Sequence, residues 1–226
     1  MNLCIIPARG GSKRIPKKNI KHFHGKPIIS YSIAAAIDSK VFDKVIVSTD
    51  DDEIKIVSES CGADVPFLRP NEISDDYTGT TEVIAHAVQW SINAGFKPEY
   101  VCCLHATAPF VIAEDIKMGY ENLIASGADY AFAITKYNFP IQRALRLKNN
   151  GRLEMFEPAN YSVRSQDLEQ AWHDAGQFYW GKSSAWLDRK MIFSENACPV
   201  PLPSYRVQDI DTLDDWRRAE VLFAIK

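Results

Sequence analysis

Residues 3–19 read Leu-Cys-Ile-Ile-Pro-Ala-Arg-Gly-Gly-Ser-Lys-Arg-Ile-Pro-Lys-Lys-Asn, a short apolar run followed by a basic, glycine-containing stretch. The run Leu3–Ile6 has the length and composition of a buried strand. The next thirteen residues, 7–19, hold five basic side chains and two glycines. Glycines let backbone amides approach a ligand, and Arg and Lys donate charge-assisted hydrogen bonds to phosphate oxygens. We therefore expect a polyphosphate site after the first strand, with a solvated basic turn as the alternative.

This stretch differs from two common phosphate-binding motifs. It matches neither the GxxxxGK[ST] loop nor the GxGxxG turn that opens a dinucleotide-binding unit. Kinase-like and NAD-binding functions are therefore disfavoured.

Farther along the chain, short apolar runs alternate with longer segments of helical period. Strands are expected at 3–6, 44–48, 64–67, 100–104 and 130–135, and helices at 27–38, 51–60, 80–93, 113–125 and 212–225. Pro27 suits a first helical turn, and Asp50 can cap the next helix. The alternation predicts an α/β fold, an open twisted sheet with helices on both faces and with ligands at the carboxyl ends of its strands.

The length of 226 residues fits a single domain, 1–226. The regular alternation lapses after residue 136, where Pro140, Gly151 and Pro158 fall among many polar residues. Residues 152–156 are a possible strand inside this stretch. We therefore expect an inserted lobe at about 137–175.

Composition narrows the class of protein. The net charge of −3 provides no broad basic field for a nucleic acid, so no nucleic-acid partner is expected. The five cysteines are an odd number without a CxxC pair, which favours packing roles in a reducing compartment. The amino terminus lacks a secretory pattern and no apolar run approaches a membrane span, so we expect a cytoplasmic protein with no membrane partner.

A pair of alternating aspartates, Asp209 and Asp211, precedes the last expected helix. On an extended segment both carboxylates point to one face and can reach one hard cation, and Mg²⁺ needs only one or two such ligands besides phosphate oxygens and waters. The competing interpretation is helix capping by Asp211 or Thr212.

Residues 6–13, Ile-Pro-Ala-Arg-Gly-Gly-Ser-Lys, together with Pro16 and residues 18–20, Lys-Asn-Ile, resemble the signature of the CMP-sialic acid synthetase family. The similarity continues through residues 48–50, 69–70, 80–81, 104–109 and 209–211. Over 161–180 the chain is most similar to the pseudaminic acid cytidylyltransferases of that family.

This resemblance implies a Rossmann-like nucleotidyltransferase fold, a three-layer αβα arrangement with a mostly parallel sheet. It implies transfer of a cytidylyl group from CTP to a nonulosonic acid, with Mg²⁺ as cofactor and release of pyrophosphate, for bacterial surface-glycan or flagellin glycosylation. It also implies a homodimer built through the inserted lobe.

The resemblance further assigns roles to individual residues. Arg9, Lys18 and Asp211 would be catalytic, and Asp209 and Asp211 would bind the metal. The residues that would bind the nucleotide are Ala8, Arg9, Gly10, Gly11, Ser12, Lys18, Asn19, Arg69, Thr80, Thr81 and His105. For Ala8, Gly10 and Gly11 the contribution would come mainly from the backbone.

A cluster of polar residues follows the lobe. A nonulosonic acid carries a carboxylate and several hydroxyl or amide groups, which call for an arginine and neutral hydrogen-bonding partners. The candidates for binding the sugar are Arg164, Gln166, Asp174, Gln177 and Tyr179, with His173 nearby. Each of them can instead be an ordinary polar residue of the lobe.

Residues 104–109, Leu-His-Ala-Thr-Ala-Pro, depart from the family, which typically has Gln-Pro-Thr-Ser-Pro there. His105 replaces the glutamine, and an imidazole can also donate one hydrogen bond and accept another. A structural role for His105 is the competing interpretation. At the level of function, the alternatives are an enzyme for N-acetylneuraminate, legionaminate or Kdo, and a noncatalytic nucleotide-binding module.

Overall fold

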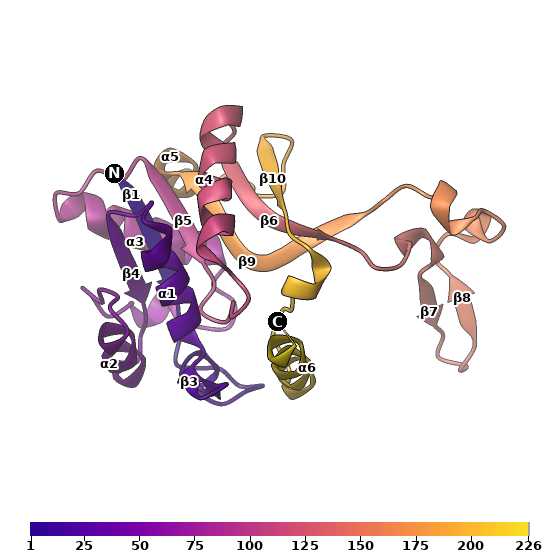
Figure 1. The fold of residues 1–226 in the computed structure, drawn as a ribbon, viewed down its shortest axis with the longest axis horizontal. Helices are drawn as coiled ribbons and strands as arrows, with labels where there is room; N and C mark the ends of the chain where they lie inside the picture. Colours follow the sequence, from indigo (N-terminus) through magenta and orange to yellow (C-terminus); the bar gives the residue numbers. More distant parts are fainter. Residues whose placement is uncertain (226) are drawn as a thin grey trace.

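A computed structural model describes residues 1–225 of the chain, and its centre is a six-stranded sheet in the order β10-β6-β9-β5-β1-β4 (Figure 1). The strands are β1 (Asn2–Pro7), β4 (Lys44–Ser48), β5 (Tyr100–Leu104), β6 (Tyr130–Lys136), β9 (Trp172–Lys182) and β10 (Ala197–Pro201). β1 is parallel to β4 and β5, and β10 is parallel to β6, whereas β9 is antiparallel to both of its neighbours. The α/β fold predicted from the sequence is confirmed.

Helices cover both faces of the sheet, as the sequence predicts. The helices are α1 (Ile29–Ser39), α2 (Asp52–Ser60), α3 (Thr80–Asn93), α4 (Ala113–Ser126), α5 (Ser183–Leu187) and α6 (Leu213–Ala224). Ile33 of α1 and Ile116 of α4 pack in one core with Cys4 and Trp180. Ile84 of α3 and Trp186 of α5 belong to a second core, with Leu3 and Ile5 of β1. None of the helices in residues 1–225 combines the length and apolar character needed to span a membrane.

One of the strands expected from the sequence is absent. Residues 64–67 lie beside β4 but form only isolated parallel bridges there, Ile46 with Asp64 and Thr49 with Leu68. Pro66 lies between these two points and has no N–H to donate, which explains why the hydrogen-bond ladder is interrupted. The prediction of a strand at 64–67 was therefore wrong.

Two expected helix starts also differ. Pro27 pairs with His22 in a two-stranded hairpin, β2 (His22–Phe23) with β3 (Lys26–Pro27), so α1 begins at Ile29. The cap of α2 is Asp51, whose Oδ1 accepts a hydrogen bond from the backbone N–H of Ile54 at 2.9 Å. Asp50 instead accepts one from the backbone N–H of Gly10 at 2.9 Å, so it holds the glycine loop and does not cap the helix.

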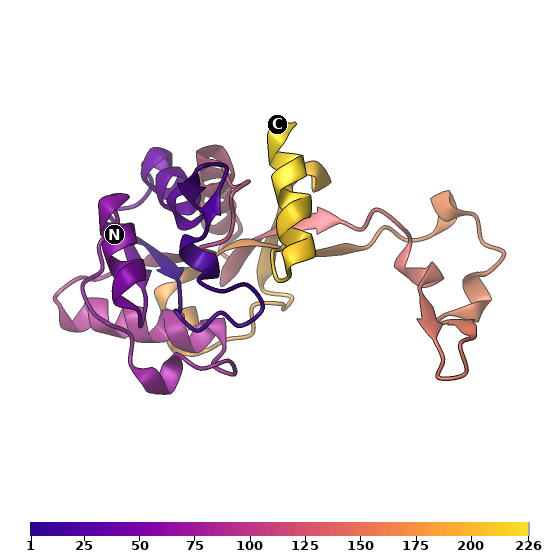
Figure 2. The same ribbon diagram turned by 90° about the horizontal axis from the view of Figure 1, so that it is seen from below.

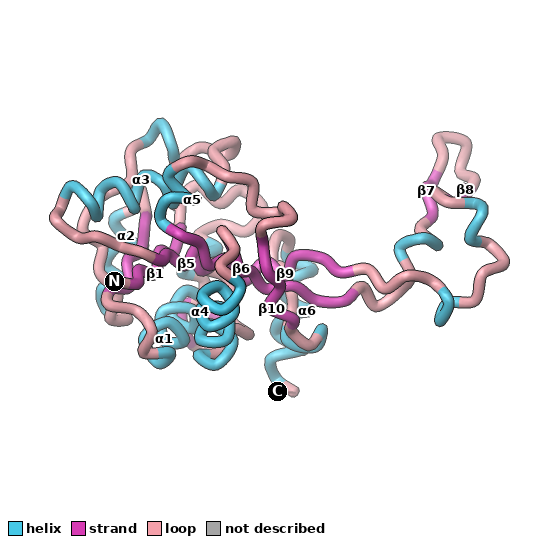
Figure 3. Tube along the Cα trace, turned by 90° about the horizontal axis from the view of Figure 1, so that it is seen from above, coloured by secondary structure: helices cyan, strands magenta, loops and turns pink. Residues whose placement is uncertain are grey.

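Residues 137–171 leave the sheet between β6 and β9 and project as a separate lobe (Figure 2). β6 and β9 stay paired as they run out of the sheet toward it, with Lys136 opposite Trp172 (Figure 3). The lobe holds the hairpin of β7 (Leu145–Leu147) with β8 (Leu153–Met155), and three 3₁₀ turns, η3 (Ile141–Arg143), η4 (Pro158–Asn160) and η5 (Ser165–Asp167).

A third core joins the two ends of the chain. Ile15 of the basic loop and Ile210 of the aspartate segment are both fully buried in it, together with Phe23 and Trp216 of α6. This packing fixes residues about 195 positions apart on one side of the molecule. It therefore brings the basic stretch and the aspartate pair together at the edge of the sheet where β1 and β5 end.

Candidate active site

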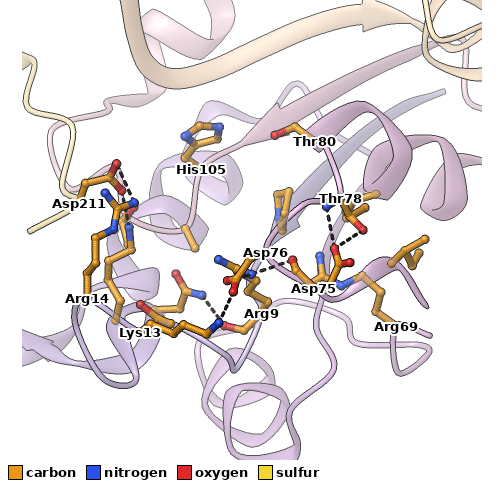
Figure 4. Close-up of a pocket in the computed structure, with 18 of the residues that line it drawn as sticks. Arg9, Lys13, Arg14, Arg69, Asp75, Asp76, Thr78, Thr80, His105 and Asp211 are labelled. Carbon is orange, nitrogen blue, oxygen red and sulfur yellow. Dashed lines mark hydrogen bonds and ion pairs between the residues drawn. The ribbon is translucent and has the colours of Figure 1, made fainter. Parts of the chain in front are cut away.

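A cavity of about 620 Å³ opens at the carboxyl ends of β1 and β5 (Figure 4). We call it the first cavity; its lining is Pro7, Arg9, Ser12, Lys13, Arg14, Lys18, Asn19, Arg69, Ile73, Asp75, Asp76, Thr78, Thr80, Val83, His105, Ala106, Thr107, Asp209 and Asp211. Both motifs that the sequence singled out, the basic loop and the aspartate pair, contribute to it. Its position matches the rule that ligands bind at strand carboxyl ends in open α/β sheets.

Arg9 is the cation at the centre of the basic loop. Its Nη1 lies 2.6 Å from Asp76 Oδ1 and donates a hydrogen bond to the backbone oxygen of Asp75 at 2.7 Å. Lys13 pairs with the same Asp76 carboxylate (Figure 4). Asn19 donates from its side chain to the backbone oxygen of Arg9 at 2.9 Å, so it supports the loop from inside. Asp76 thus pairs with two cations of the cavity lining, Arg9 and Lys13.

The glycines of the loop have different surroundings. A Cβ at Gly10 would lie 2.7 Å from Asp51 Oδ2 and 2.9 Å from Asp51 Cβ, so only glycine lets the loop pack against the start of α2. At Gly11 a Cβ would meet nothing within 4 Å. Ala8 is fully buried and its N–H donates to the backbone oxygen of Ser48, which continues the β1–β4 pairing by one residue. Ser12 lines the cavity, whereas Ala8, Gly10 and Gly11 are not part of its lining.

Lys18 connects the basic loop to the aspartate pair. Its Nζ donates to the backbone oxygen of Ile210 at 2.6 Å and lies 3.3 Å from Asp211 Oδ1. Arg14 contacts the other oxygen of Asp211 at 3.0 Å. Asp211 is free for these contacts because Thr212, and not Asp211, caps α6 in a capping box with Asp215. Of the two capping alternatives left open by the sequence, Thr212 is therefore the one observed.

Asp209 and Asp211 have the chemistry of a divalent-cation site. Burial, and then the neighbouring Asp211 carboxylate, raise the pKa of Asp209 above its ordinary value. A cation between the two would relieve both penalties, and carboxylate oxygens are the ligands that Mg²⁺ prefers. No group of three or more His, Cys, Asp or Glu side chains is placed to hold a metal ion within residues 1–225, so the remaining ligands would be phosphate oxygens and waters.

Arg69 stands at the opposite end of the cavity from Asp211 (Figure 4). It is only 4% exposed, its Nε donates to Ser74 Oγ at 3.1 Å, and its Nη2 lies 3.7 Å from Asp50 Oδ1. Burial lowers the pKa of the guanidinium, and Asp50 opposes this. Nη2 is buried without a hydrogen-bond partner within the described structure, so this arginine keeps one donor available.

A second cavity, also about 620 Å³, adjoins the first one through Thr80 and His105, which line both. Its remaining lining is Thr81, Glu82, Asp174, Tyr179, Arg189, Lys190, Met191, Ile192 and Phe193. Thr80 and Thr81 begin α3, but no side-chain cap bond is made there, so their hydroxyls are not used as caps. Two neighbouring cavities with a common wall provide room for two reactants side by side.

His105 on this common wall and Tyr179 in the second cavity are neighbouring titratable groups, with ring centroids 5.4 Å apart. Burial lowers the pKa of His105, although Asp174 and Asp209 act in the opposite direction, so the neutral imidazole is favoured near pH 7. The Tyr179 hydroxyl donates to Asp174 Oδ2. Burial and the Asp174 charge raise the pKa of Tyr179 far above its ordinary value, so this phenol stays protonated.

The residues proposed from sequence for the sugar divide into two groups. Asp174, Gln177 and Tyr179 lie on β9, and Asp174 and Tyr179 line the second cavity. Gln177 is 3% exposed, and its side chain donates to the backbone oxygen of Arg206 at 2.6 Å. Arg164 and Gln166 lie in the lobe, outside both cavity linings; Arg164 pairs with Asp167 at 2.7 Å.

The segment 189–193 was missed by sequence reasoning. It reads Arg-Lys-Met-Ile-Phe, and all five side chains line the second cavity. Arg189 has a left-handed backbone (φ 51°), and this arginine forms no ion pair within residues 1–225. Lys190 by contrast is paired with Asp129 at 2.8 Å. An exposed, mixed basic and apolar run of this kind carries no motif, so only its position reveals it.

Comparisons with known proteins agree with this geometry. A family model described as cytidylyltransferase matches residues 3–191. A pseudaminic acid cytidylyltransferase from Campylobacter jejuni subsp. jejuni serotype O:2 is 46% identical, covering 99% of this chain and 97% of its own. An N-acylneuraminate cytidylyltransferase from Escherichia coli O18:K1:H7 is 31% identical over 96% of this chain and 51% of its own. A CMP-N,N'-diacetyllegionaminic acid synthase from Legionella pneumophila is 30% identical over 99% and 96%.

Solved structures support the fold. A CMP:2-keto-3-deoxy-manno-octonic acid synthetase complexed with CTP superposes with a TM-score of 0.73 at 15% identity, covering 99% of this chain and 98% of the other. A 4-diphosphocytidyl-2C-methyl-D-erythritol synthase from Anaerococcus prevotii gives 0.64 at 12% identity over 99% and 98%. The described architecture is thus the Rossmann-like nucleotidyltransferase fold. From the basic loop at the end of β1 to the matches along nearly its whole length, this chain belongs to the cytidylyltransferase family.

Proposed function

We propose that this protein transfers a cytidylyl group from CTP to a nonulosonic acid, most specifically pseudaminic acid, and releases pyrophosphate. The observation that carries the proposal is the pair of adjoining cavities with His105 and Thr80 between them. The first is lined by cations and paired carboxylates, as a metal-bound triphosphate requires. The second is lined by fewer charged side chains than the first and by a larger share of apolar ones, together with hydrogen-bonding groups, as an amidated acid sugar requires. The 46% identity to a pseudaminic acid cytidylyltransferase supports the choice of sugar.

On the nucleotide side, Arg9 and Lys18 neutralise the triphosphate, and Ser12 and Asn19 lie beside them in the cavity lining. Arg69 offers a buried donor at the far end, where the base or ribose would lie beside Thr80. Binding CTP requires Arg9 to exchange its Asp76 contact for phosphate, or to bind phosphate through its remaining donors. These groups position the α-phosphate for in-line attack and stabilise the charge that develops on it.

On the metal side, Asp209 and Asp211 are the residues that would hold Mg²⁺. The ion, when bound, supplies charge neutralisation at the phosphates. Lys18 and Arg14 pair with Asp211. When Mg²⁺ and the nucleotide bind together, Asp211 binds the metal and the same two cations pair with the phosphates. Asp209 and Asp211 fall outside the family-model match at 3–191, so their assignment depends on the geometry and on the family pattern.

On the sugar side, Asp174 provides an acceptor and Thr81 a hydroxyl. The O–H of Tyr179 donates to Asp174, so the Tyr179 oxygen is left to accept from the sugar. Arg189 is the unpaired cation of the second cavity and is suited to the sugar carboxylate. Met191, Ile192 and Phe193 form the apolar part of its wall, against which acetamido methyl groups can pack. The neutral imidazole of His105 faces the junction, where the anomeric hydroxyl and the α-phosphate would meet.

We further propose a homodimer formed through the lobe. Eight large hydrophobic side chains are exposed on it: Tyr137, Phe139, Ile141, Leu145, Leu147, Leu153, Phe156 and Tyr161. Such a concentration of apolar surface is typical of an interface. Light scattering tests the proposed dimer, with an expected mass of twice 25.5 kDa; a monomer would contradict it.

The five free cysteines favour a cytoplasmic location.

A substrate panel tests the reaction. The purified protein is incubated with CTP, Mg²⁺ and, separately, pseudaminic, N-acetylneuraminic and legionaminic acids and Kdo, and pyrophosphate release is followed. We expect the highest kcat/KM with pseudaminic acid, and no release with CTP alone. A higher value for another sugar would replace the proposed substrate. No release with any of them, despite measurable CTP binding, would favour a noncatalytic nucleotide-binding module.

A further inference from the structure

The segment that carries Asp209 and Asp211 has little regular structure. It joins the end of β10 at Pro201 to the start of α6 at Leu213, and within these described residues the helical part is the short turn η6 (Ser204–Arg206). No strand ladder fixes Asp209 in space. The position of its carboxylate must therefore depend on contacts made by neighbouring residues.

Arg206 provides the charged anchor on the amino-terminal side of Asp209, and the partly buried Val207 next to it packs against the main core. Its Nη1 and Nη2 bind Asp115 Oδ2 and Oδ1 at 2.5 and 3.0 Å, a two-pronged arrangement that fixes both distance and orientation. Asp115 lies in the first turn of α4 and is 4% exposed. The Asp115 carboxylate raises the pKa of Arg206 above its ordinary value. A helix of the main core therefore anchors the aspartate segment three residues before Asp209.

Gln177, on strand β9 of the sheet, forms a second contact with Arg206. Its side-chain N–H donates to the backbone oxygen of Arg206 at 2.6 Å, and its own backbone oxygen accepts from the N–H of His105 at 2.8 Å. Strand β9 thus links the end of β5, where the two cavities meet, to the start of the aspartate segment. The side chain of Gln177 is directed to this link and is 3% exposed.

The carboxyl-terminal side of Asp209 is fixed independently. Ile210 is fully buried in the third core, and its backbone oxygen accepts the Lys18 Nζ–H at 2.6 Å. Asp209 therefore lies between two fixed points, Arg206 and Ile210. Loss of the first would leave only the partly buried Val207 to hold Asp209 on its amino-terminal side, whereas the basic loop that contains Arg9 would keep all its own contacts.

We propose that Asp115, Arg206 and Gln177, which we call the brace, are positioning residues that set the Asp209 carboxylate at the distance from Asp211 that one divalent cation requires. This proposal rests on the proposed function, because it assumes the metal site. A buried ion pair contributes little net stability compared with apolar packing. The two parallel hydrogen bonds of this pair, however, fix the distance and orientation of the two groups more closely than an apolar contact would. None of the three residues needs to touch nucleotide, metal or sugar to act in this way.

Calorimetric titration of CTP without sugar tests the brace, since no turnover can occur. Each protein is titrated with CTP once in the presence of Mg²⁺ and once in the presence of EDTA. The dissociation constant of CTP in EDTA divided by that in Mg²⁺ measures how much the cation strengthens binding. For Asp115→Asn we expect this ratio to fall about tenfold relative to the unaltered protein, because residues that orient metal ligands typically change metal affinity by 10–100-fold. The EDTA value should stay unchanged, because Arg9, Ser12 and Asn19 are untouched.

Two further variants keep the test decisive if Asp115→Asn does not fold. Arg206→Lys keeps the charge but removes the fork, and Gln177→Met removes the N–H donor at similar size; both should lower the same ratio. Because sugar is absent, a sugar-binding role of Gln177 cannot produce that change. Glu121→Gln is the matched control on α4, since it breaks only an exposed contact with Lys117 at 3.9 Å, and it should change nothing.

Each outcome has a definite meaning. If folded brace variants keep the full Mg²⁺ gain and lose only thermal stability, the residues are merely structural and the proposal is wrong. If the unaltered protein gains nothing from Mg²⁺, the metal site of the proposed function fails, and the brace fails with it. If the unaltered protein gains and the brace variants do not, both stand.

Discussion

The two cavities differ in how their residues are distributed along the chain. The first draws most of its cations from the contiguous stretch 9–18, which folds as one loop held by Asp50, Asp51 and Ile15. The second combines the start of α3, one face of β9 and the irregular run 189–193. The proposed nucleotide half is therefore built as a local unit, whereas the proposed sugar half exists only through tertiary structure. This is an arrangement in which one half can stay constant while the other changes with the substrate.

The largest effect is expected at Asp209 and Asp211, the proposed metal ligands of the first cavity. Replacing Asp211 by Ala removes a proposed metal ligand and leaves Arg14 and Lys18 without their carboxylate. Pyrophosphate release should fall at least about a hundredfold, since even residues behind a metal ligand can cost that much. Steady-state kinetics at several Mg²⁺ concentrations would measure it. Asp214→Ala, an exposed carboxylate of the same helix start, is the control; a near-normal rate for Asp211→Ala would remove Asp211 from the site.

The next largest effect separates the cations of the basic loop. Arg9 lines the first cavity, whereas Lys17 pairs with Glu53 of α2 and does not line it. A hydrogen bond to a charged group contributes about 1.5–3 kcal/mol, so Arg9→Ala should lower kcat/KM for CTP about ten- to a hundredfold. Lys17→Ala should leave it nearly unchanged. Equal losses for both variants would mean that the loop acts through its general charge and not through a specific contact.

The same difference explains what could be predicted from the sequence. Four of the six strands of the main sheet, β1, β4, β5 and β6, follow from apolar runs, whereas β9 and β10 are not among the strands expected from the sequence. The basic loop follows from its own composition. The roles of Asp50 and Asp51 could not be separated, because both are good caps and only the approach of Gly10 decides between them. The run 189–193 could not be found, because its function depends on Trp186 and Tyr130 fixing a loop beside β9.

A smaller effect is expected in the second cavity. Arg189→Ala removes its unpaired cation, and KM for the sugar should rise about tenfold, the value of one charge-assisted hydrogen bond. KM for CTP in the same variant is the internal control and should not move, because Arg189 does not line the first cavity. A parallel rise in both constants would show a general loosening of the fold. No rise at all would transfer the carboxylate contact to another cation, with Arg164, the arginine that the sequence suggested for the sugar, as the next to be tested.

The smallest effect concerns His105, at the wall common to both cavities. Its pKa is lowered in the folded protein by burial, against the opposing charges of Asp174 and Asp209 and in the same direction as Lys18. Below its ordinary value of about 6.5 the unfolded chain therefore binds a proton that the folded protein resists. The stability that depends on neutral His105 is fully present above that pH and is lost as pH falls toward the lowered pKa. Melting temperatures between pH 7.5 and 5.5 should consequently decrease less for His105→Gln than for the unaltered protein.

His86, whose pKa is also lowered by burial, is present in both proteins and cancels in the comparison. Parallel pH profiles would show that the pKa of His105 is the same in the folded and unfolded protein, which would contradict the prediction.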